Sequence, residues 1–295
     1  MICEAGSENN YLEGNGNEIL TYGTVTKMSR VYSQPVGTLL RDWRKRRRLS
    51  QLDLACDAEI SSRHLSFLET GRSVPSREMV LRLAGKLEVP FRERNELLVA
   101  AGYAPVFKAT SLEDPTLQAA RTVVDLLLKG HEPYPALAVD RHWTMLSANR
   151  MVSLLVSGIE SSLLEPPVNV LRLTLHPGGL VTRIVNLPEW RSHLFARLRR
   201  QIDLTADPVL VDLLNELSSY PMPNQSYQTT TPADFAGVAI PFQLATEAGV
   251  LSFISTTTVF GTPIDITLSE LALESFFPAD ALTFDTLNQL FRQYQ

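Results

Sequence analysis

The sequence predicts a multi-domain protein in which an all-α domain of short helices precedes an α+β domain built on an antiparallel sheet. Three observations lead to this prediction. The chain has 295 residues, whereas one domain ordinarily takes about 100 to 200. Residues 36–104 show only helical spacing, and the last third of the chain shows strand composition. Residues 36–94 hold 13 Lys and Arg against 8 Asp and Glu (+5), and the remainder holds 14 against 24 (−10).

Composition indicates a folded protein outside the secretory route. Hydrophobic residues make up 44% and charged residues 20% of the chain, which is typical of a globular protein. No apolar run approaches the roughly 18 residues of a membrane span, and no secretory signal is evident at the N-terminus. The two cysteines, Cys3 and Cys56, argue against a disulfide framework and against a cysteine metal site. We therefore expect a cytoplasmic protein that contacts no membrane.

Changes in composition place the domain boundaries. Residues 1–33 are rich in Gly, Asn, Ser and Glu without periodicity, so we expect a flexible tail. The sequence leaves open whether translation starts at Met1 or at Met28. We place the helical domain at residues 34–106, a linker at 107–113 and the α+β domain at 114–295.

Four or five short helices are expected in the first domain. Apolar residues at i, i+3, i+4 and i+7 from Val36 predict the first helix, which continues into the basic run at 44–48. The serines expected to cap the next three helices are Ser50, Ser61 and Ser76. Asp53 completes a capping box with the first of these serines. A last helix within residues 92–103 ends at Gly102.

The second domain mixes helices with short strands. Asp114-Pro115 begins a helix that ends at Gly130, and two short strands follow around a turn at residues 140–142. Residues 169–175 alternate at period two and predict another strand. Further helices are expected after Asn149, at 188–201, at 208–218 and from Thr283; further strands at 235–245, 250–261 and within 268–277; and a loop at 219–232. These elements predict an antiparallel sheet with helices on one side.

The segment SSRHLSFLETG, residues 61–71, predicts a helix with two contrasting faces. At 100° per residue, Ser62, Ser66 and Arg63 fall on one arc that contains no acidic residue. Two leucines fall on the opposite side, where they can pack against a neighbouring helix. An ordinary amphipathic surface helix has the same pattern. The surrounding sequence therefore decides whether the polar face has a function or is only a solvated surface.

The surrounding sequence has the spacing of a helix-turn-helix. A helix from Gln51 and a turn at 58–60 precede the helix that begins near Ser62. Arg63 can donate two hydrogen bonds to guanine, and short serines allow the backbone to approach DNA. The candidates for phosphate contacts are Gln51, Arg41, Arg44, the rest of the basic run to Arg48, and Arg72. A small helical bundle with a solvated basic face is the alternative.

Residues LSQLDLACDAEISSRHLSFLETG resemble the DNA-binding domain of phage-repressor-like (XRE/Cro-type) proteins, whose second helix enters the major groove. The positions at which that family reads bases hold Ser62, Arg63 and Phe67, and those at which it contacts phosphate or supports these residues hold Gln51 and Ser61. We expect Phe67 to contact a thymine methyl group rather than the core. Glu59 stands in the turn where such proteins often have glycine.

A longer string, SSRHLSFLETGRSVPSREMVLRLAGKLEVPFRERNELLVAAGYAP, resembles the MmyB-like transcription regulators. The resemblance continues in VDRHWTMLSAN, NVLRLTLHPGG, IVNLPEWRSHLFARLRR and ELALESFFPADALTFDTL, and so extends from about residue 34 to the end. It implies a bacterial regulator whose PAS-like C-terminal domain senses a small lipophilic ligand such as a fatty acid. It implies no obligatory cofactor beyond that ligand. The expected partners are a double-stranded DNA operator, the ligand and a second copy of the chain.

Apolar residues and isolated polar residues of the second domain are the candidates for the ligand pocket. They are Trp143, Met145, Asn149, Met151, Leu155, Arg172, His176, Trp190, Phe195, Phe242 and Phe253. Other roles stay open for several of them. Trp190 and Phe195 also fit a hydrophobic core, and Asn149 fits a helix cap. Three roles are open for Arg172: an ion pair with an acid, contact with a ligand carboxylate, or exposure to solvent. Two are open for the HPGG segment from His176: an anion-binding site or a plain turn.

The sequence contains no signature of an enzyme. Its five histidines lack metal-ligand spacing, and HExxH, CxxC, GxSxG, P-loop and GxGxxG motifs are absent. We therefore expect no catalytic residues and no metal site. Two other hypotheses stay open: that the second domain is an unrecognised enzyme, or that it is a ligand-free scaffold that dimerises or recruits a partner.

Overall fold

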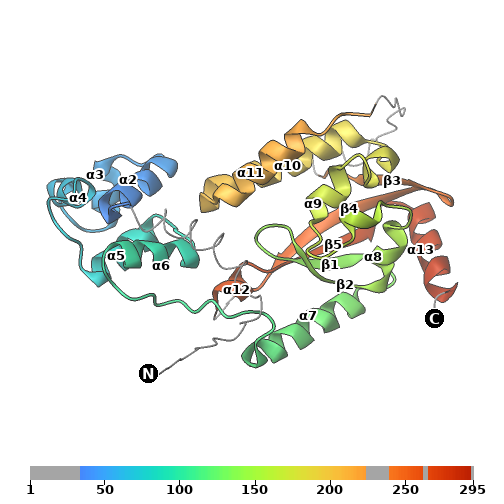
Figure 1. The fold of residues 1–295 in the computed structure, drawn as a ribbon, viewed down its shortest axis with the longest axis horizontal. Coiled ribbons are helices and arrows are strands. Elements are labelled where there is room, and N and C mark those ends of the chain that lie inside the picture. Colours follow the sequence, from blue (N-terminus) through green and yellow to red (C-terminus); the bar gives the residue numbers. More distant parts are fainter. Residues whose placement is uncertain (1–33, 224–238, 262–264, 294–295) are drawn as a thin grey trace, which may run out of the picture. The chain divides into compact units, whose positions relative to one another are not determined.

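The computed structural model of the protein describes residues 34–223, 239–261 and 265–293 (Figure 1). These residues form two compact units, one within Met1–Glu88 and Arg94–Pro105 and the other within Val89–Glu93 and Val106–Gln295. The sequence predictions that lie wholly or partly outside the described residues are the tail at 1–33, the loop at 219–232 and the start of the strand at 235–245. None of the helices described is long and apolar enough to cross a membrane.

The first unit consists of short helices, as predicted. The helices are α2 (Val36–Arg46), α3 (Gln51–Asp57), α4 (Ser62–Glu69), α5 (Arg77–Lys86) and α6 (Phe91–Ala100), the last of which joins this unit from Arg94. The three serine caps form, and Ser50 and Asp53 exchange the two hydrogen bonds of a capping box. Fully buried leucines from the helices fill the core: Leu40, Leu54, Leu65, Leu83 and Leu97.

The turn between α3 and α4 holds a non-glycine residue in the left-handed conformation. Glu59 has a φ of 55°, and the next residue, Ile60, donates its N–H to the Ala55 carbonyl at 2.9 Å. A residue with a Cβ atom at such a φ costs roughly 1–2 kcal/mol, and glycine escapes this cost. Glu59 therefore keeps the helix-turn-helix geometry at the expense of backbone strain.

We expect Glu59→Gly to raise the free energy of unfolding of the first unit by about 1 kcal/mol, because the relief of strain exceeds the extra freedom of glycine in the unfolded chain. Urea denaturation followed by circular dichroism measures the change. Glu78→Gly, at an exposed position of α5, is the matched control and should lower stability. A loss of stability in Glu59→Gly would contradict the expectation.

The second unit is an α+β fold on a five-stranded antiparallel sheet with strand order β2-β1-β5-β4-β3 (Figure 1). Its strands are β1 (Ala136–Val139), β2 (Met145–Ala148), β3 (Phe242–Thr246), β4 (Gly249–Val259) and β5 (Ala272–Pro278). Its α-helices are α7 (Gln118–Gly130), α8 (Arg150–Leu155), α9 (Val170–Leu175), α10 (Leu187–Thr205), α11 (Pro208–Ser219), α12 (Ile266–Ser269) and α13 (Ala281–Gln293). The 3-10 turns are at Pro115–Leu117, Ser161–Leu163 and Leu180–Arg183.

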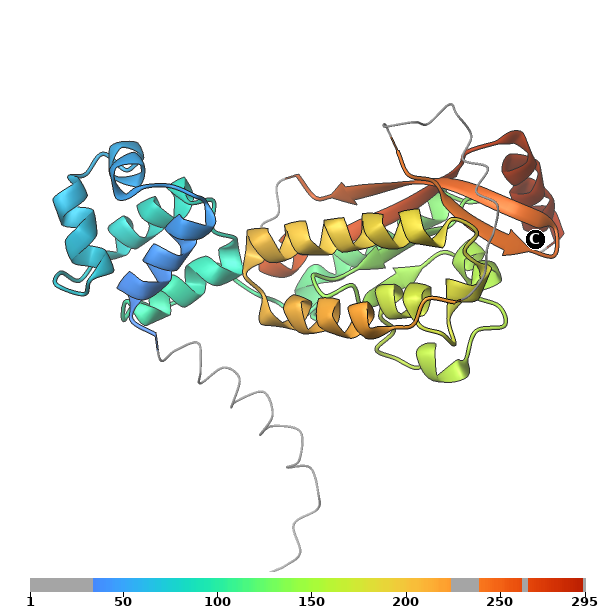
Figure 2. The ribbon, with the colours of Figure 1, turned by 90° about the horizontal axis from the view of Figure 1, so that it is seen from above.

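Helices pack against both faces of the sheet, so the prediction of helices on one side is wrong. All four residues of β1 are buried, and they alternate between two hydrophobic clusters. Leu137 and Val139 face the larger cluster, which includes residues of α8, α9, α10 and α11. Ala136 and Ala138 face Val124 and other residues on the α7 side. Figure 2 shows α10 and α11 side by side over the sheet.

Residues 169–175 form helix α9 with its cap rather than the predicted strand. Asn169 accepts hydrogen bonds from the N–H groups of Leu171 and Arg172, both at 3.1 Å, which is an N-cap. The apolar alternation is compatible with a short helix, because Leu171 and Leu175, four residues apart, are buried on the same side. Over so few residues the cap, not the period of two, decides the conformation.

The segment predicted as a linker is bound to the second unit. Asp265 accepts hydrogen bonds from the N–H and hydroxyl of Thr110, and the Lys108 carbonyl accepts one from Ile266 at 2.8 Å. Asp265 also caps α12 through Thr267. Residues 268 and 269, which were predicted to lie in a strand, belong to this short helix, and β5 begins only at Ala272.

Candidate functional sites: a recognition helix and an apolar cavity

Helix α4 has the two faces that its sequence predicts. Leu65 and Leu68 are fully buried, and the helix packs against α2 and α3. Ser62 and Arg63 are exposed at its N-terminal end, after the exposed cap Ser61. Ser66 and Phe67 are half-buried. The helix therefore presents small polar side chains and one cation beside an accessible aromatic ring.

Phe67 contacts two arginines. The guanidinium of Arg63 is 5.4 Å from the centre of the phenyl ring, and that of Arg72 is 5.8 Å away. Both distances fit cation–π contacts. The ring thus contacts one cation from the start of α4 and one from the segment that follows the helix. Contact of Phe67 with a thymine methyl group stays a prediction.

A buried glutamate at the end of α4 binds three of the predicted phosphate-contacting residues. Glu69 is 2% exposed and accepts hydrogen bonds from Arg44 at 2.6 and 2.8 Å and from Gln51 at 2.8 Å. Arg41 donates to the Glu69 carbonyl at 3.0 Å. Arg44 also donates to the Leu49 carbonyl at 2.8 Å, so its guanidinium is largely used inside the fold. The sequence did not predict this structural role.

The Glu69 carboxylate stays ionised although it is buried. Burial by itself would raise the pKa of Glu69, but the hydrogen bonds from Arg44 and Gln51 and the charges of Arg44 and Arg41 lower the pKa below its usual value. The charge of Glu69 is therefore part of the folded unit at neutral pH.

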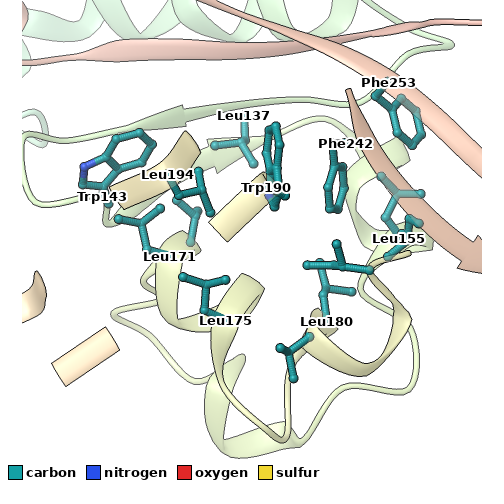
Figure 3. Packing of buried hydrophobic residues seen from close by; sticks show 14 of the residues in the cluster. Leu137, Trp143, Leu155, Leu171, Leu175, Leu180, Trp190, Leu194, Phe242 and Phe253 are labelled. Atoms are coloured by element: carbon teal, nitrogen blue, oxygen red, sulfur yellow. The ribbon is translucent and has the colours of Figure 1, made fainter. Parts of the chain in front are cut away.

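The second unit contains an apolar cavity of about 80 Å³ between the sheet and the helices α8, α9 and α10. Four of the predicted ligand residues line it, namely Trp143, Leu155, Trp190 and Phe242. Figure 3 shows Trp190 and Phe242 next to each other, and their ring centres are 5.0 Å apart. Most of the other lining residues are leucines and valines. The cavity suits an apolar ligand better than a polar one.

Two charged residues that sequence reasoning missed also line the cavity. Arg197 donates to both carboxylate oxygens of Glu274, at 2.7 and 3.1 Å, and Glu274 is 4% exposed. The Arg197 guanidinium also lies 4.8 Å from the centre of the Trp143 ring. Trp190, Leu194 and Arg197 have the i, i+4, i+7 spacing of one helix face, and this spacing is the signal that could have indicated Arg197.

Two family models match the chain. A helix-turn-helix domain matches residues 35–97, which contain α2 to α5. The MmyB-like transcription regulator ligand binding domain matches residues 120–290, more than half of the chain. The chain belongs to the MmyB-like transcription regulators. It is therefore a DNA-binding transcription regulator with a ligand-binding domain, and neither matched model describes an enzyme.

The other comparisons add nothing to the assignment of the chain to the MmyB-like regulators. No curated protein matches the chain. Among solved structures, an RNA-binding Light-Oxygen-Voltage receptor aligns over 96% of this chain and 69% of that chain, with 11% sequence identity. Its TM-score of 0.26 is too low to indicate a shared fold.

The three polar residues predicted to bind the ligand of the regulator make contacts within the fold. Arg172 is exposed and forms an ion pair with Glu216, with both hydrogen bonds at 2.7 Å. Asn149 occupies the N-cap position of α8, but its side chain bonds backbone groups of Ala136, Leu128 and Tyr134. The His176 ring accepts a hydrogen bond from Gly178 N–H in the turn after α9 and packs edge-on against Tyr220. None of these three side chains lines the cavity.

The remaining predicted pocket residues belong to the core around the cavity. Met151 and Phe253 are fully buried in the larger cluster, and Met145 and Phe195 pack against it partly buried. They do not line the cavity themselves. Their burial agrees with their apolar character, and their contact with a ligand stays a prediction.

Proposed function

We propose that this MmyB-like regulator is a cytoplasmic protein that reads its operator with α4, and that a fatty-acyl or similar lipophilic ligand in the cavity changes operator binding. The observation that carries the proposal is the cavity with aromatic and aliphatic walls, in a chain whose α4 exposes Arg63 beside Phe67. No other cofactor is required for this function.

Ligand binding must enlarge the cavity. Its volume of about 80 Å³ is smaller than the roughly 150 Å³ of an engineered protein cavity that binds benzene. We propose that an acyl chain widens the cavity by moving α9 or α10 away from the sheet. Because ligands shift an equilibrium only through different affinities for two arrangements, this movement supplies the difference that regulation needs.

The ligand-binding part of the proposal is tested with saturated twelve-carbon compounds. A compound that binds the folded state raises the melting temperature of the protein in proportion to the logarithm of its concentration. Native mass spectrometry of the same samples gives the stoichiometry, and a gel-shift titration shows whether operator affinity changes. Absence of binding by every compound would favour a ligand-free scaffold.

Arg63→Ala is expected to lower the preference for one base pair of the operator by ~1–3 kcal/mol, because it removes the donor that can bind guanine. Competition gel shifts with operators varied at each position measure the preference. Lys86→Ala removes one exposed cation from the end of α5 and is the charge-matched control. Binding of wild type should also weaken steeply with salt. Unchanged base preference in Arg63→Ala would contradict the role of Arg63.

We also propose that the regulator acts as a homodimer, because helix-turn-helix regulators commonly bind paired half-sites. The outer face of α7 supports a contact between copies, since Val123, Leu126 and Leu127 are exposed apolar side chains on that helix. The double variant Leu126→Glu with Leu127→Glu should convert the dimer to a monomer, as measured by light scattering. Thr122→Glu, at another exposed position of α7, is the control and should change the mass in solution less. A monomeric wild-type protein at micromolar concentration would contradict the proposal.

A further inference from the structure

The polar end of the cavity carries no net charge. Within the described part of the chain, the charged side chains that line the cavity are Arg197 and Glu274, and they form one ion pair. Thr257 completes the arrangement: its hydroxyl accepts from Arg197 at 2.7 Å and donates to Glu274 at 2.9 Å. Both carboxylate oxygens of Glu274 and both terminal nitrogens of Arg197 thus have partners.

A ligand carboxylate would meet an arginine that is already neutralised. To bind Arg197, the carboxylate would have to lie beside the buried Glu274 carboxylate or displace it. Two carboxylates in one poorly solvated site repel each other, and a displaced Glu274 would be left as a buried charge without its partner. An uncharged polar group meets neither of these penalties.

The same cavity offers a hydrogen-bond donor without an acceptor. Trp190 lines the cavity and is 4% exposed, and its Nε1–H has no hydrogen-bond partner among the described residues. A buried N–H group without an acceptor costs free energy, which a carbonyl or hydroxyl oxygen of a ligand would recover. The neighbouring rings of His193 and Phe242 offer no such oxygen.

From these contacts we infer that the cavity selects lipophilic molecules with an uncharged hydrogen-bonding end, such as esters, amides or alcohols, over the corresponding free carboxylate. The inference rests on the proposed function, since it assumes that the cavity receives a lipophilic ligand. The alkyl chain lies among the leucines and aromatic rings, and the uncharged polar end accepts a hydrogen bond from Trp190 or meets the Arg197–Glu274 pair, which lies about two turns further along α10.

The test compares ligands that differ only in the polar end. Dodecanoic acid, dodecanamide, dodecanol and methyl dodecanoate are titrated into the full chain at pH 7.5, below their solubility limits and below the micelle concentration of the acid, with melting temperature and native mass spectrometry as readouts. We expect the amide or the ester to bind at least about tenfold more tightly than the acid. Equal or tighter binding of the acid would overturn this inference alone, and failure of all four compounds to bind would overturn the proposed function with it.

Glu274→Gln provides a second, opposite test. Glutamine keeps the size of the side chain but leaves Arg197 unneutralised, so affinity for dodecanoic acid should rise by about tenfold or more relative to dodecanamide. Glu216→Gln is the matched control, because Glu216 pairs with Arg172 on the surface and does not line the cavity. Trp190→Phe should weaken binding of the amide more than binding of dodecane. An unchanged acid-to-amide ratio in Glu274→Gln would overturn the role of the ion pair.

Discussion

Glu69→Ala is expected to lower the free energy of unfolding of the first unit by about 3–5 kcal/mol, because it leaves the buried Arg44 guanidinium without its partner. The side chain of Arg44 is 11% exposed and that of Glu69 is 1% exposed, so water replaces the lost contacts poorly. The amide of Gln51 loses its acceptor in the same variant. Urea denaturation of the full chain, followed by circular dichroism, measures the loss.

Two further variants separate the ion pair from a general effect of truncation. Glu78→Ala removes an exposed acid from α5 and should change stability by less than about 0.5 kcal/mol. The double variant Arg44→Met with Glu69→Leu removes both charges and should be markedly more stable than Glu69→Ala, since an apolar pair carries no desolvation cost. If both variants lose the same stability as Glu69→Ala, the ion pair is not the cause.

The Glu69 network also predicts how the stability of the first unit depends on pH. The pKa of Glu69 is lower in the folded unit than its usual value of 4.5, because the hydrogen bonds and charges of its partners outweigh burial. Folding therefore favours the ionised form, so this stabilisation is complete above about pH 4.5 and is lost as the pH falls through the folded pKa. In Glu69→Gln the free energy of unfolding should therefore fall less steeply as the pH is lowered. Part of the fall should remain, because hydrogen bonds with Ser50 also lower the pKa of Asp53.

Local signals predicted much of the fold. The serine caps, the turn at Glu59 and the two faces of α4 depend on residues within one or two helical turns, and each was predicted from such short stretches. The strands β1 and β2 were predicted in the same way, as two short segments around a turn at residues 140–142. The failure at α9 has the same origin, because six residues carry too few periods to separate a strand from a helix.

The charged pairs could not be predicted in this way, because their partners are distant in sequence. Arg44 and Glu69 are 25 residues apart, and Arg197 and Glu274 are 77 residues apart. The polar residues chosen for the pocket were isolated in apolar segments, yet in the fold each of them has a neighbour of its own, as Arg172 has Glu216. Only the packing of helices on the sheet decides which polar side chains reach the cavity.

Gly37→Ala is expected to destabilise the first unit by about 3 kcal/mol or more, because α2 and α4 touch at this residue. A Cβ atom on Gly37 would lie 2.2 Å from the Leu68 carbonyl oxygen and 2.9 Å from that of Glu69. Both obstacles are backbone atoms at the end of α4, so no side-chain rotation can relieve the overlap. Gly85→Ala is the matched control: nothing lies within 4 Å of its added Cβ, so alanine should stabilise α5 by up to about 1 kcal/mol.

The consequence of Gly37→Ala for DNA binding distinguishes a displaced helix from a merely less stable one. The overlap can be relieved only if α2 and α4 move apart, and this movement would shift Ser61, Ser62 and Arg63 relative to the other helices of the unit. We therefore expect operator affinity to fall at least about tenfold even at temperatures where circular dichroism shows a fully folded protein. Full affinity in the folded Gly37→Ala protein would contradict the expectation. It would mean that operator binding does not depend on the position of α4 that its contact with Gly37 fixes.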